Sequence, residues 1–175
     1  MKKILATFLI FFLSSQNIFA TDFSKIKERP VQNNYHFTSY FPSMDELYKY
    51  RKAIVIDTKI GNLKAYFYGQ EIWSFDASVG KYNFETPKGK FRIVQKNRLP
   101  KSKTSGLYMP FWMEFRGNGK YGIHGFPLYP NKTPKYPNED KFSRTKLAGG
   151  CVRVQKENIK ILYDWVELLT TVIIL

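Results

Sequence analysis

Hydrophobic and polar residues alternate with a period of two over much of this chain, and short turns separate the apolar runs. The clearest case is the segment 72–79, in which one set of alternate residues is apolar and the other is mostly polar. This pattern is typical of a strand with one buried face. The apolar runs predict strands at 53–57, 63–68, 72–79, 90–95, 107–115, 121–124 and 170–175.

A helical period appears only late in the chain, where Ile159, Leu162, Val166 and Leu169 recur within the segment 156–169. A second, short helix is predicted at 43–51, with Ser43 as its N-cap and Glu46 making the reciprocal contact. Many short strands and one late helix predict a mainly β domain, a two-sheet β-sandwich, in preference to a parallel α/β sheet.

The first twenty residues have the features of a secretory signal peptide. Lys2 and Lys3 precede the uncharged run 4–13, and the segment ends at Ala20. The run is short for a transmembrane span, and an uncleaved signal that serves as an anchor is the alternative. We therefore expect a signal peptide at 1–20, an N-terminal arm at 21–51 and one domain at 52–175, in a protein exported to the periplasm or cell wall.

The net charge is strongly positive, with 28 basic and 14 acidic residues, or +14. Without residues 1–20, which hold two lysines and no acid, 26 basic residues face 14 acidic ones, or +12. Such a charge favours polyanionic partners, although a merely solvated surface gives the same count. Export argues against nucleic acid, so we expect acidic peptide stems of the cell envelope, with peripheral association with anionic lipid as a further option.

Cys151 is the only cysteine, so it cannot form a disulfide within the chain. A thiol needs a neighbouring base or a group of amides to become a strong nucleophile. Gly149 and Gly150 precede it and can aim successive N–H groups at one point, as an oxyanion hole requires. The alternative is a tight turn followed by a buried, inert cysteine.

His124 is the candidate base, because the other histidine, His36, falls in the irregular arm. A structural histidine at a strand end is the alternative. One cysteine and two histidines offer no plausible zinc set, so we expect neither a metal nor a cofactor. By alternation Arg153 points to the same side as Cys151, where it could hold a carboxylate or tie down a loop.

Two of these segments, Ile123-His124-Gly125 and the run 148–154, together resemble the active-site signature of the L,D-transpeptidase (YkuD) catalytic domain. The resemblance extends to the strand 54–57, the hairpin that ends at 79–81, and the turn 86–89 with its Thr-Pro-Lys-Gly sequence. The closing helix and strand also fit, so the likeness covers about residues 52–175.

The chain departs from that family in two places. The family usually has Ser or Thr followed by His or Lys before the Gly-Cys pair, whereas this chain has Ala148 and Gly149. The connection 126–147 is also longer than the family norm. It contains several prolines and two tyrosines and is expected to be a lid, a binding loop or a disordered insert. These residues are Pro127, Tyr129, Pro130, Pro134, Tyr136 and Pro137.

The resemblance implies a peptidoglycan enzyme of wall biogenesis and cell shape. Cys151 would attack a tetrapeptide stem, His124 would act as base and acid with its ring oriented by the Gly125 carbonyl, and amides at Gly149 and Gly150 would bind the oxyanion. D-Alanine would leave from a thioester. Arg153, Tyr108, Met109 and Trp112 are the expected substrate-binding residues.

The acyl acceptor stays open at this point. A second stem gives a 3-3 cross-link, a lysine of an outer-membrane protein gives anchoring, and water gives an L,D-carboxypeptidase. A binding protein that has lost catalysis is the remaining alternative.

Overall fold

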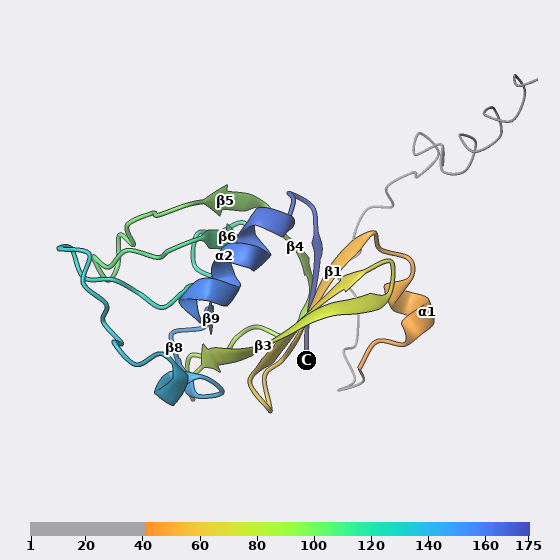
Figure 1. Ribbon diagram of the computed structural model, residues 1–175, viewed down its shortest axis with the longest axis horizontal. Helices are drawn as coiled ribbons and strands as arrows, with labels where there is room; N and C mark the ends of the chain where they lie inside the picture. The colour runs from red at the N-terminus through yellow and green to blue at the C-terminus, as the bar shows by residue number, and fades with distance from the viewer. Residues whose placement is uncertain (1–40) are drawn as a thin grey trace, which may run out of the picture. The chain divides into compact units, whose positions relative to one another are not determined.

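The computed structural model describes residues 41–175 (Figure 1). The expected signal peptide at 1–20 and the first part of the arm lie outside this range. In chain order the elements are α1 (Met44–Leu47), β1 (Lys52–Asp57), β2 (Asn62–Phe67), β3 (Gln70–Gly80), β4 (Gly89–Arg92), β5 (Gln95–Asn97), β6 (Trp112–Glu114), β7 (Gly122–Gly125), the 3₁₀ helix η2 (Asp140–Phe142), β8 (Lys146–Ala148), β9 (Val152–Val154), α2 (Lys156–Trp165) and β10 (Thr171–Ile174).

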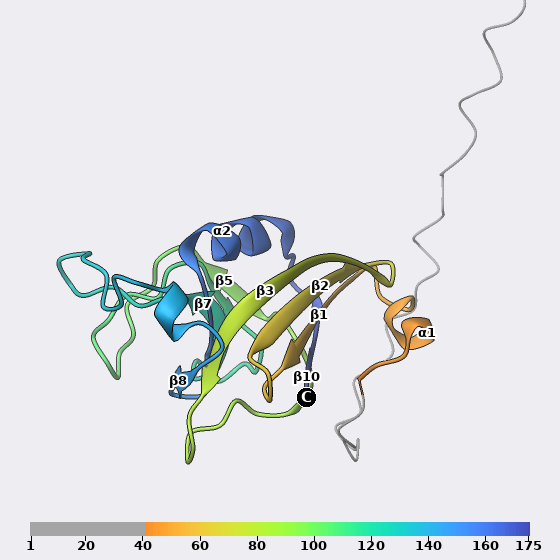
Figure 2. The ribbon, with the colours of Figure 1, turned by 60° about the horizontal axis from the view of Figure 1, so that its bottom comes forward.

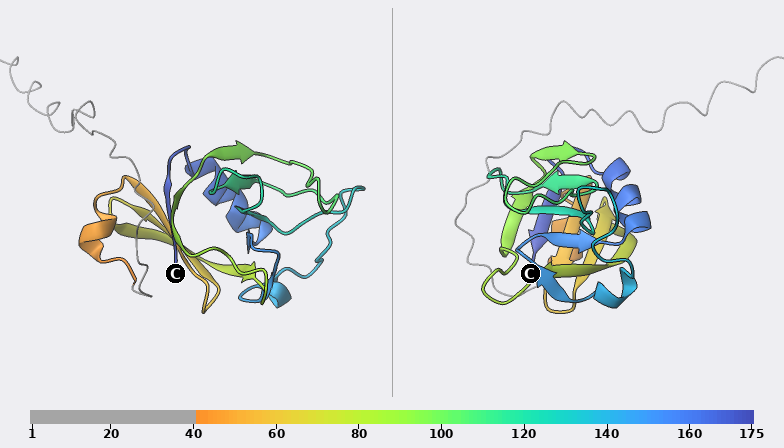
Figure 3. Two further views of the ribbon diagram at one scale, coloured as in Figure 1. Left: turned by 180° about the vertical axis from the view of Figure 1, so that it is seen from behind. Right: turned by 90° about the vertical axis from the view of Figure 1, so that its left-hand side faces the viewer.

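The predicted mainly β class with one late helix is confirmed, but the strands do not form two separate sheets. They follow one hydrogen-bonded path, β4-β10-β1-β2-β3-β9-β7-β6-β5, with β8 beside β3. The path is mixed, since β10 runs parallel to β1 and β9 parallel to β7. The sheet curls because β3 is long, with 11 residues, and carries both halves (Figures 2 and 3).

The inner surface of the curled sheet holds the main core. Side chains from both halves meet there, among them Ile54, Leu63, Ile123 and Val152. The helix α2 lies along this side (Figure 1) and buries Ile159 and Leu162 in the same cluster. The period-two pattern of the strands and the helical period of α2 therefore point at one shared core.

A second, smaller cluster lies on the outer surface of β1, β2 and β10. Leu47 of α1 is fully buried there against Ala53, Val55, Tyr66 and Ile173. Part of the expected arm is thus packed on the sheet. Its helix is shorter than predicted, at four residues, and the side-chain oxygen of Ser43 accepts from the Glu46 N–H at 3.2 Å.

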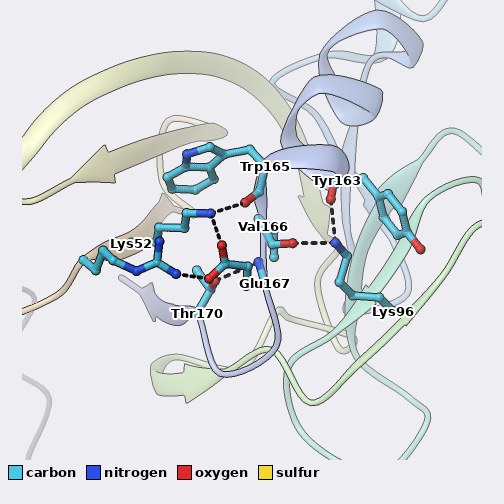
Figure 4. Close-up of polar contacts among 8 residues, drawn as sticks. Lys52, Lys96, Tyr163, Trp165, Val166, Glu167 and Thr170 are labelled. Atoms are coloured by element: carbon cyan, nitrogen blue, oxygen red, sulfur yellow. Dashed lines mark hydrogen bonds and ion pairs between the residues drawn. The ribbon is translucent and has the colours of Figure 1, made fainter. Parts of the chain in front are cut away.

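The helix α2 ends at Trp165, four residues earlier than the apolar period predicted, because the backbone of Val166 is extended. Two lysine ammonium groups donate hydrogen bonds to the last carbonyls of the helix from either side (Figure 4). Lys52 Nζ lies 2.7 Å from the Trp165 carbonyl oxygen and Lys96 Nζ lies 2.7 Å from that of Tyr163. Cations at a helix C-terminus are favoured by its partial negative charge. Leu169, expected on the buried helix face, is 50% exposed.

Three other expectations need adjustment. The run 107–115 contributes only three strand residues, β6, and the run 90–95 divides between β4 and β5. In the strand predicted at 63–68, Phe67 is 39% exposed although the period of two puts it on the same face as buried Leu63 and Ala65. It stands at the end of β2, where the sheet leaves the core. None of the helices in residues 41–175 has the length and apolar content needed to cross a bilayer.

Candidate active site

Cys151 and His124 come together because β7 and β9 are neighbouring parallel strands. The register pairs Ile123 with Val152 and His124 with Arg153. Val152 and Ile123 face the core, so the alternate residues His124, Arg153 and Cys151 face the opposite side of the sheet. Strand spacing and rise place the Cα atoms of Cys151 and His124 about 8 Å apart, on one diagonal. Two side chains pointing to the same side can close that separation.

The His124 ring is held in one orientation by its own neighbour. Its Nδ1 lies 2.6 Å from the Gly125 carbonyl oxygen, and the ring stacks near the indole of Trp112 with centroids 5.6 Å apart. A carbonyl oxygen only accepts, so Nδ1 carries the proton and Nε2 is left as the base.

Gly125 has no side chain, so α2 and the segment at Pro110 can approach the backbone that orients the His124 ring. A Cβ atom there would lie 3.2 Å from Ile159 Cγ2 of α2 and 3.3 Å from Pro110 Cβ. The Gly125 N–H also donates to the Pro110 carbonyl at 2.7 Å. Glycine therefore lets α2 and the segment at Pro110 pack directly against the strand that orients His124.

Burial keeps the imidazole neutral. His124 is 1% exposed, and desolvation lowers its pKa from 6.5 to about 3. The positive charge of Arg153 lowers this pKa further, while the hydrogen bond to the Gly125 carbonyl raises it. At neutral pH the Nε2 atom therefore holds no proton and is free to accept one.

The turn that carries Cys151 needs a glycine at position 150. Gly150 has φ +94°, and a Cβ there would lie 2.7 Å from the Tyr121 ring. The N–H groups of Gly149 and Gly150 donate to none of the turn and loop hydrogen bonds in residues 41–175. Two amides next to the thiol are thus left without a backbone partner in the described residues, and an oxyanion hole needs such donors.

Cys151 itself is half-buried, and its thiol lies 3.5 Å from the Lys120 carbonyl oxygen. Burial raises the pKa of the thiol, against opposing effects from a Gly122 hydrogen bond and from Arg153. The resting site therefore holds a neutral thiol beside a neutral imidazole. Within the described residues the hydrogen bond of the thiol goes to the Lys120 carbonyl and not to the His124 ring.

Arg153 lies between this pair and the long connection 126–147. Its Nη1 is 3.4 Å from the Tyr136 hydroxyl, and the guanidinium carbon is 5.4 Å from the centre of the Tyr136 ring. Its Nε is buried without a hydrogen-bond partner. No carboxylate in the described part of the chain forms an ion pair with Arg153. A buried, unpaired N–H is costly, so this guanidinium suits an anionic ligand.

The connection 126–147 is tied down along its length. Leu128 and Tyr108 exchange two backbone hydrogen bonds of 2.9 and 3.0 Å, and Tyr136 packs edge-on against both Phe126 and Phe142. Near its end, the Glu139 carboxylate accepts from the Lys156 N–H at 2.7 Å, at the start of α2. The segment therefore follows a fixed course past Arg153.

A protein-family comparison agrees with this geometry, since the model of the L,D-transpeptidase catalytic domain (YkuD) matches residues 51–174. The chain belongs to this family. A comparison with curated proteins finds no match. The two positions at which the YkuD signature is altered, Ala148 and Gly149, have different surroundings: Ala148 is buried, and the space around a Cβ on Gly149 is open for 4 Å.

Solved structures of L,D-transpeptidases have the same fold. One from Stackebrandtia nassauensis is 23% identical with a TM-score of 0.60, and the match covers 73% of this chain and 56% of that one. One from Mycobacterium smegmatis is 20% identical with a TM-score of 0.59, covering 72% and 59%. L,D-transpeptidase 3 from Mycobacterium tuberculosis, in complex with a faropenem-derived adduct, is 14% identical with a TM-score of 0.57, covering 71% and 60%. The YkuD chain described here spans less than two thirds of the length of each.

The other predicted substrate residues are not all placed alike. The Trp112 ring contacts that of His124, whereas the backbone of Tyr108 pairs with Leu128 and the Met109 N–H donates to the Pro100 carbonyl at 2.9 Å. Sequence reasoning missed the contact of Tyr136 with Arg153 and that of Tyr121 with Gly150. Both partners are distant in sequence, so no local pattern could have indicated these pairs. Within residues 41–175 no cluster of three or more His, Cys, Asp and Glu side chains could hold a metal ion.

Proposed function

We propose that this protein is a cysteine-dependent L,D-transpeptidase that acts on tetrapeptide stems of peptidoglycan. The observation that carries the proposal is the His124 ring fixed by the Gly125 carbonyl, one strand away from Cys151, within a YkuD domain. The product is a 3-3 cross-link or an envelope protein attached to the wall.

The first half of the reaction forms a thioester. Nε2 of His124 takes the Cys151 proton as the sulfur attacks the carbonyl carbon between the diamino acid and D-alanine. The N–H groups of Gly149, Gly150 and Cys151 receive the negative charge on the carbonyl oxygen. The C–N bond then breaks, the imidazolium returns its proton to the leaving nitrogen, and D-alanine departs.

The two neutral groups determine the timing of proton transfer. Burial lowers the pKa of His124 to about 3 and raises the pKa of Cys151, so a thiolate–imidazolium pair is disfavoured before substrate arrives. Proton transfer therefore accompanies attack on the carbonyl, when the oxyanion hole takes up charge. This arrangement limits the reaction of Cys151 with other electrophiles.

Arg153 is proposed to bind a carboxylate of the donor stem. Nη1 is engaged by Tyr136, which leaves the edge formed by Nε and Nη2 for a bidentate contact. Arg153 lies two residues after Cys151 on the same face, about 7 Å along the strand. A carboxylate close to the scissile bond would fit that interval. Trp112 is proposed to line the donor site beside His124, with Tyr108 and Met109 farther along the same segment.

The acceptor determines the biological outcome. An amine from a second stem or from an outer-membrane protein would complete transfer, with His124 as base for the incoming amine. Water in its place would make the enzyme an L,D-carboxypeptidase. The anchored connection 126–147 favours transfer, since a cover that limits water and positions an amine raises the ratio of transfer to hydrolysis. We place the reaction in the periplasm or cell wall, after export by the segment 1–20.

The deciding experiment incubates the full-length protein with purified tetrapeptide muropeptides and measures product masses. Loss of alanine with joined stems supports transpeptidation, and loss of alanine with unjoined stems assigns the carboxypeptidase. No change in either mass would indicate a binding protein without catalysis. Intact-mass measurement with a carbapenem or with faropenem should show one adduct, absent in Cys151→Ala, since a strained β-lactam amide acylates such a thiol.

A further inference from the structure

The segment 81–86, which follows β3, displays two aromatic rings to solvent. Tyr82 is 82% exposed and Phe84 is 58% exposed. The Lys81 ammonium lies 5.2 Å from the centre of the Phe84 ring. Exposed aromatic residues that gather on one short segment offer ring surface to a binding partner.

The segment is a defined turn. The Phe84 N–H donates to the Lys81 carbonyl at 2.9 Å, and Asn83 has φ +64°, as the third residue of a type II turn requires. The Asn83 N–H donates to the Glu85 carboxylate at 3.1 Å. Thr86 closes the segment, because its hydroxyl accepts from the Gly80 N–H at 2.9 Å. Both rings are thus presented from a fixed backbone, which reduces the entropy lost on binding.

This turn packs against the turn that carries the nucleophile. The Lys81 N–H donates to the Ala148 carbonyl at 2.9 Å. A Cβ on Gly150 would lie 3.5 Å from the Glu85 carbonyl oxygen. Cys151 is the third residue after Ala148, so the two lie at most about 10 Å apart. The segment that carries the exposed rings therefore borders the proposed acylation site.

We propose that Tyr82 and Phe84 form a sugar-binding surface for the glycan strand that carries the donor stem. The inference rests on the proposed function, because the peptide stem of that substrate is attached to a sugar. With the scissile carbonyl at Cys151, the three stem residues before it extend at most about 11 Å toward the glycan. The segment 81–86 lies within that reach, because the Glu85 carbonyl oxygen is 3.5 Å from a Cβ built on Gly150, the residue before Cys151.

The chemistry of the segment suits a sugar better than a second peptide. A pyranose ring has one face made largely of C–H bonds, which can stack on an aromatic ring while its hydroxyl groups remain in water. A charged stem would instead require donors and counter-charges such as those of Arg153 and the Gly149–Gly150 amides. Tyr82 and Phe84 provide ring surface, and the two charged groups beside them are already occupied within the segment, Lys81 at the Phe84 ring and Glu85 by the Asn83 N–H.

The test compares two substrates with the full-length protein: a disaccharide tetrapeptide, and the same tetrapeptide without sugar. Tyr82→Ser combined with Phe84→Ser should lower kcat/KM for the disaccharide substrate about tenfold, the combined effect of two lost ring contacts. It should leave kcat/KM for the sugar-free peptide unchanged. Tyr82→Phe combined with Phe84→Tyr, which keeps both rings, should retain most of the wild-type value for the disaccharide substrate.

Tyr68→Ser is the matched control, because Tyr68 is 41% exposed and precedes the other end of β3. Eleven strand residues span about 36 Å, so this ring is remote from the segment 81–86. An equal loss on both substrates, or no loss on either, would overturn the inference. Calorimetric measurement of the affinity for the disaccharide tetrapeptide separates the proposed sugar-binding surface from the proposed reaction, because binding can be measured without turnover. Binding that weakens in the double serine variant supports the sugar surface even where the proposed reaction fails, and unchanged binding removes it.

Discussion

The two halves of the curled sheet differ in what covers their outer surface. On β1, β2 and β10 that surface is mostly apolar and is covered by Leu47 of α1, and the hydroxyl of Tyr66 in this cluster donates to the Glu71 carboxylate at 3.4 Å. On β7 and β9 the same surface carries His124, Arg153 and Cys151, covered by loops and by Tyr136. The inner surface of both halves belongs to one core.

The difference shows how one sheet supports both stability and chemistry. The apolar half can bury both of its surfaces at little electrostatic cost. The other half buries an imidazole and a guanidinium N–H, which is unfavourable for folding. A rigid core beneath these groups fixes their positions, and the energetic cost of burying them supports the proposed reactive site.

The largest expected effect comes from removing the reactive pair. Cys151→Ala and His124→Ala should each lower kcat/KM for muropeptides by at least about 10³-fold, because each removes one half of the nucleophile and base unit. Circular dichroism should show the native fold in both. His124→Gln, which fills more of the buried space, controls for a packing defect. Wild-type activity in any of these variants would contradict the mechanism.

A substitution on the apolar half is expected to lower stability and to leave the reaction rate unchanged. Leu47→Ala should lower the free energy of unfolding by about 2–4 kcal/mol, because Leu47 is fully buried. Its kcat, measured well below the melting temperature, should match that of the wild type. Denaturant titration combined with muropeptide turnover measures both quantities. A reduced kcat in a folded Leu47→Ala sample would mean that the two halves are coupled.

Acid should destabilise the half that carries the site. The pKa of His124 is lowered from 6.5 to about 3 on folding, so the unfolded chain binds more protons between these values. Stability contributed by the neutral ring is therefore present above about pH 6.5 and is lost as the pH falls toward 3. From pH 7.5 to pH 5 the loss is about 2 kcal/mol.

Denaturant titrations at several pH values measure this loss, with His124→Gln as the control. The difference in unfolding free energy between wild type and His124→Gln should change by the same amount over that range. A difference that is independent of pH would show that His124 is not buried as a neutral ring.

The smallest expected effect concerns the choice of acceptor. Replacing the exposed tip 129–135 by a short Gly-Ser connection keeps Phe126, Tyr136 and Glu139 in place. The ratio of hydrolysed to cross-linked product should rise severalfold while thioester formation continues, because water then reaches the thioester more easily. Product masses give the ratio, and acylation by a β-lactam gives the control. An unchanged ratio with unchanged substrate binding would show that the tip has no role in acceptor choice.

Local patterns in the sequence were enough for much of the fold and for the candidate chemistry. The period of two in 72–79 predicted β3, and Ile159 and Leu162 marked the buried face of α2, because these signals depend only on backbone geometry. The lone thiol, the scarce histidines and the paired glycines indicated Cys151, His124 and Gly150 for chemical reasons that need no fold. The family followed from those residues and the strands around them.

Tertiary structure alone decided the contacts that join distant segments. The parallel register of β7 with β9 sets His124 beside Arg153, and no local signal specifies the register of strands that are far apart in sequence. The last carbonyls of α2 accept hydrogen bonds from Lys52 and Lys96, which reach them from other strands. The contact of Tyr136 with Arg153, and the packing of the segment 81–86 on the nucleophile turn, likewise arise from packing between residues that are remote along the chain.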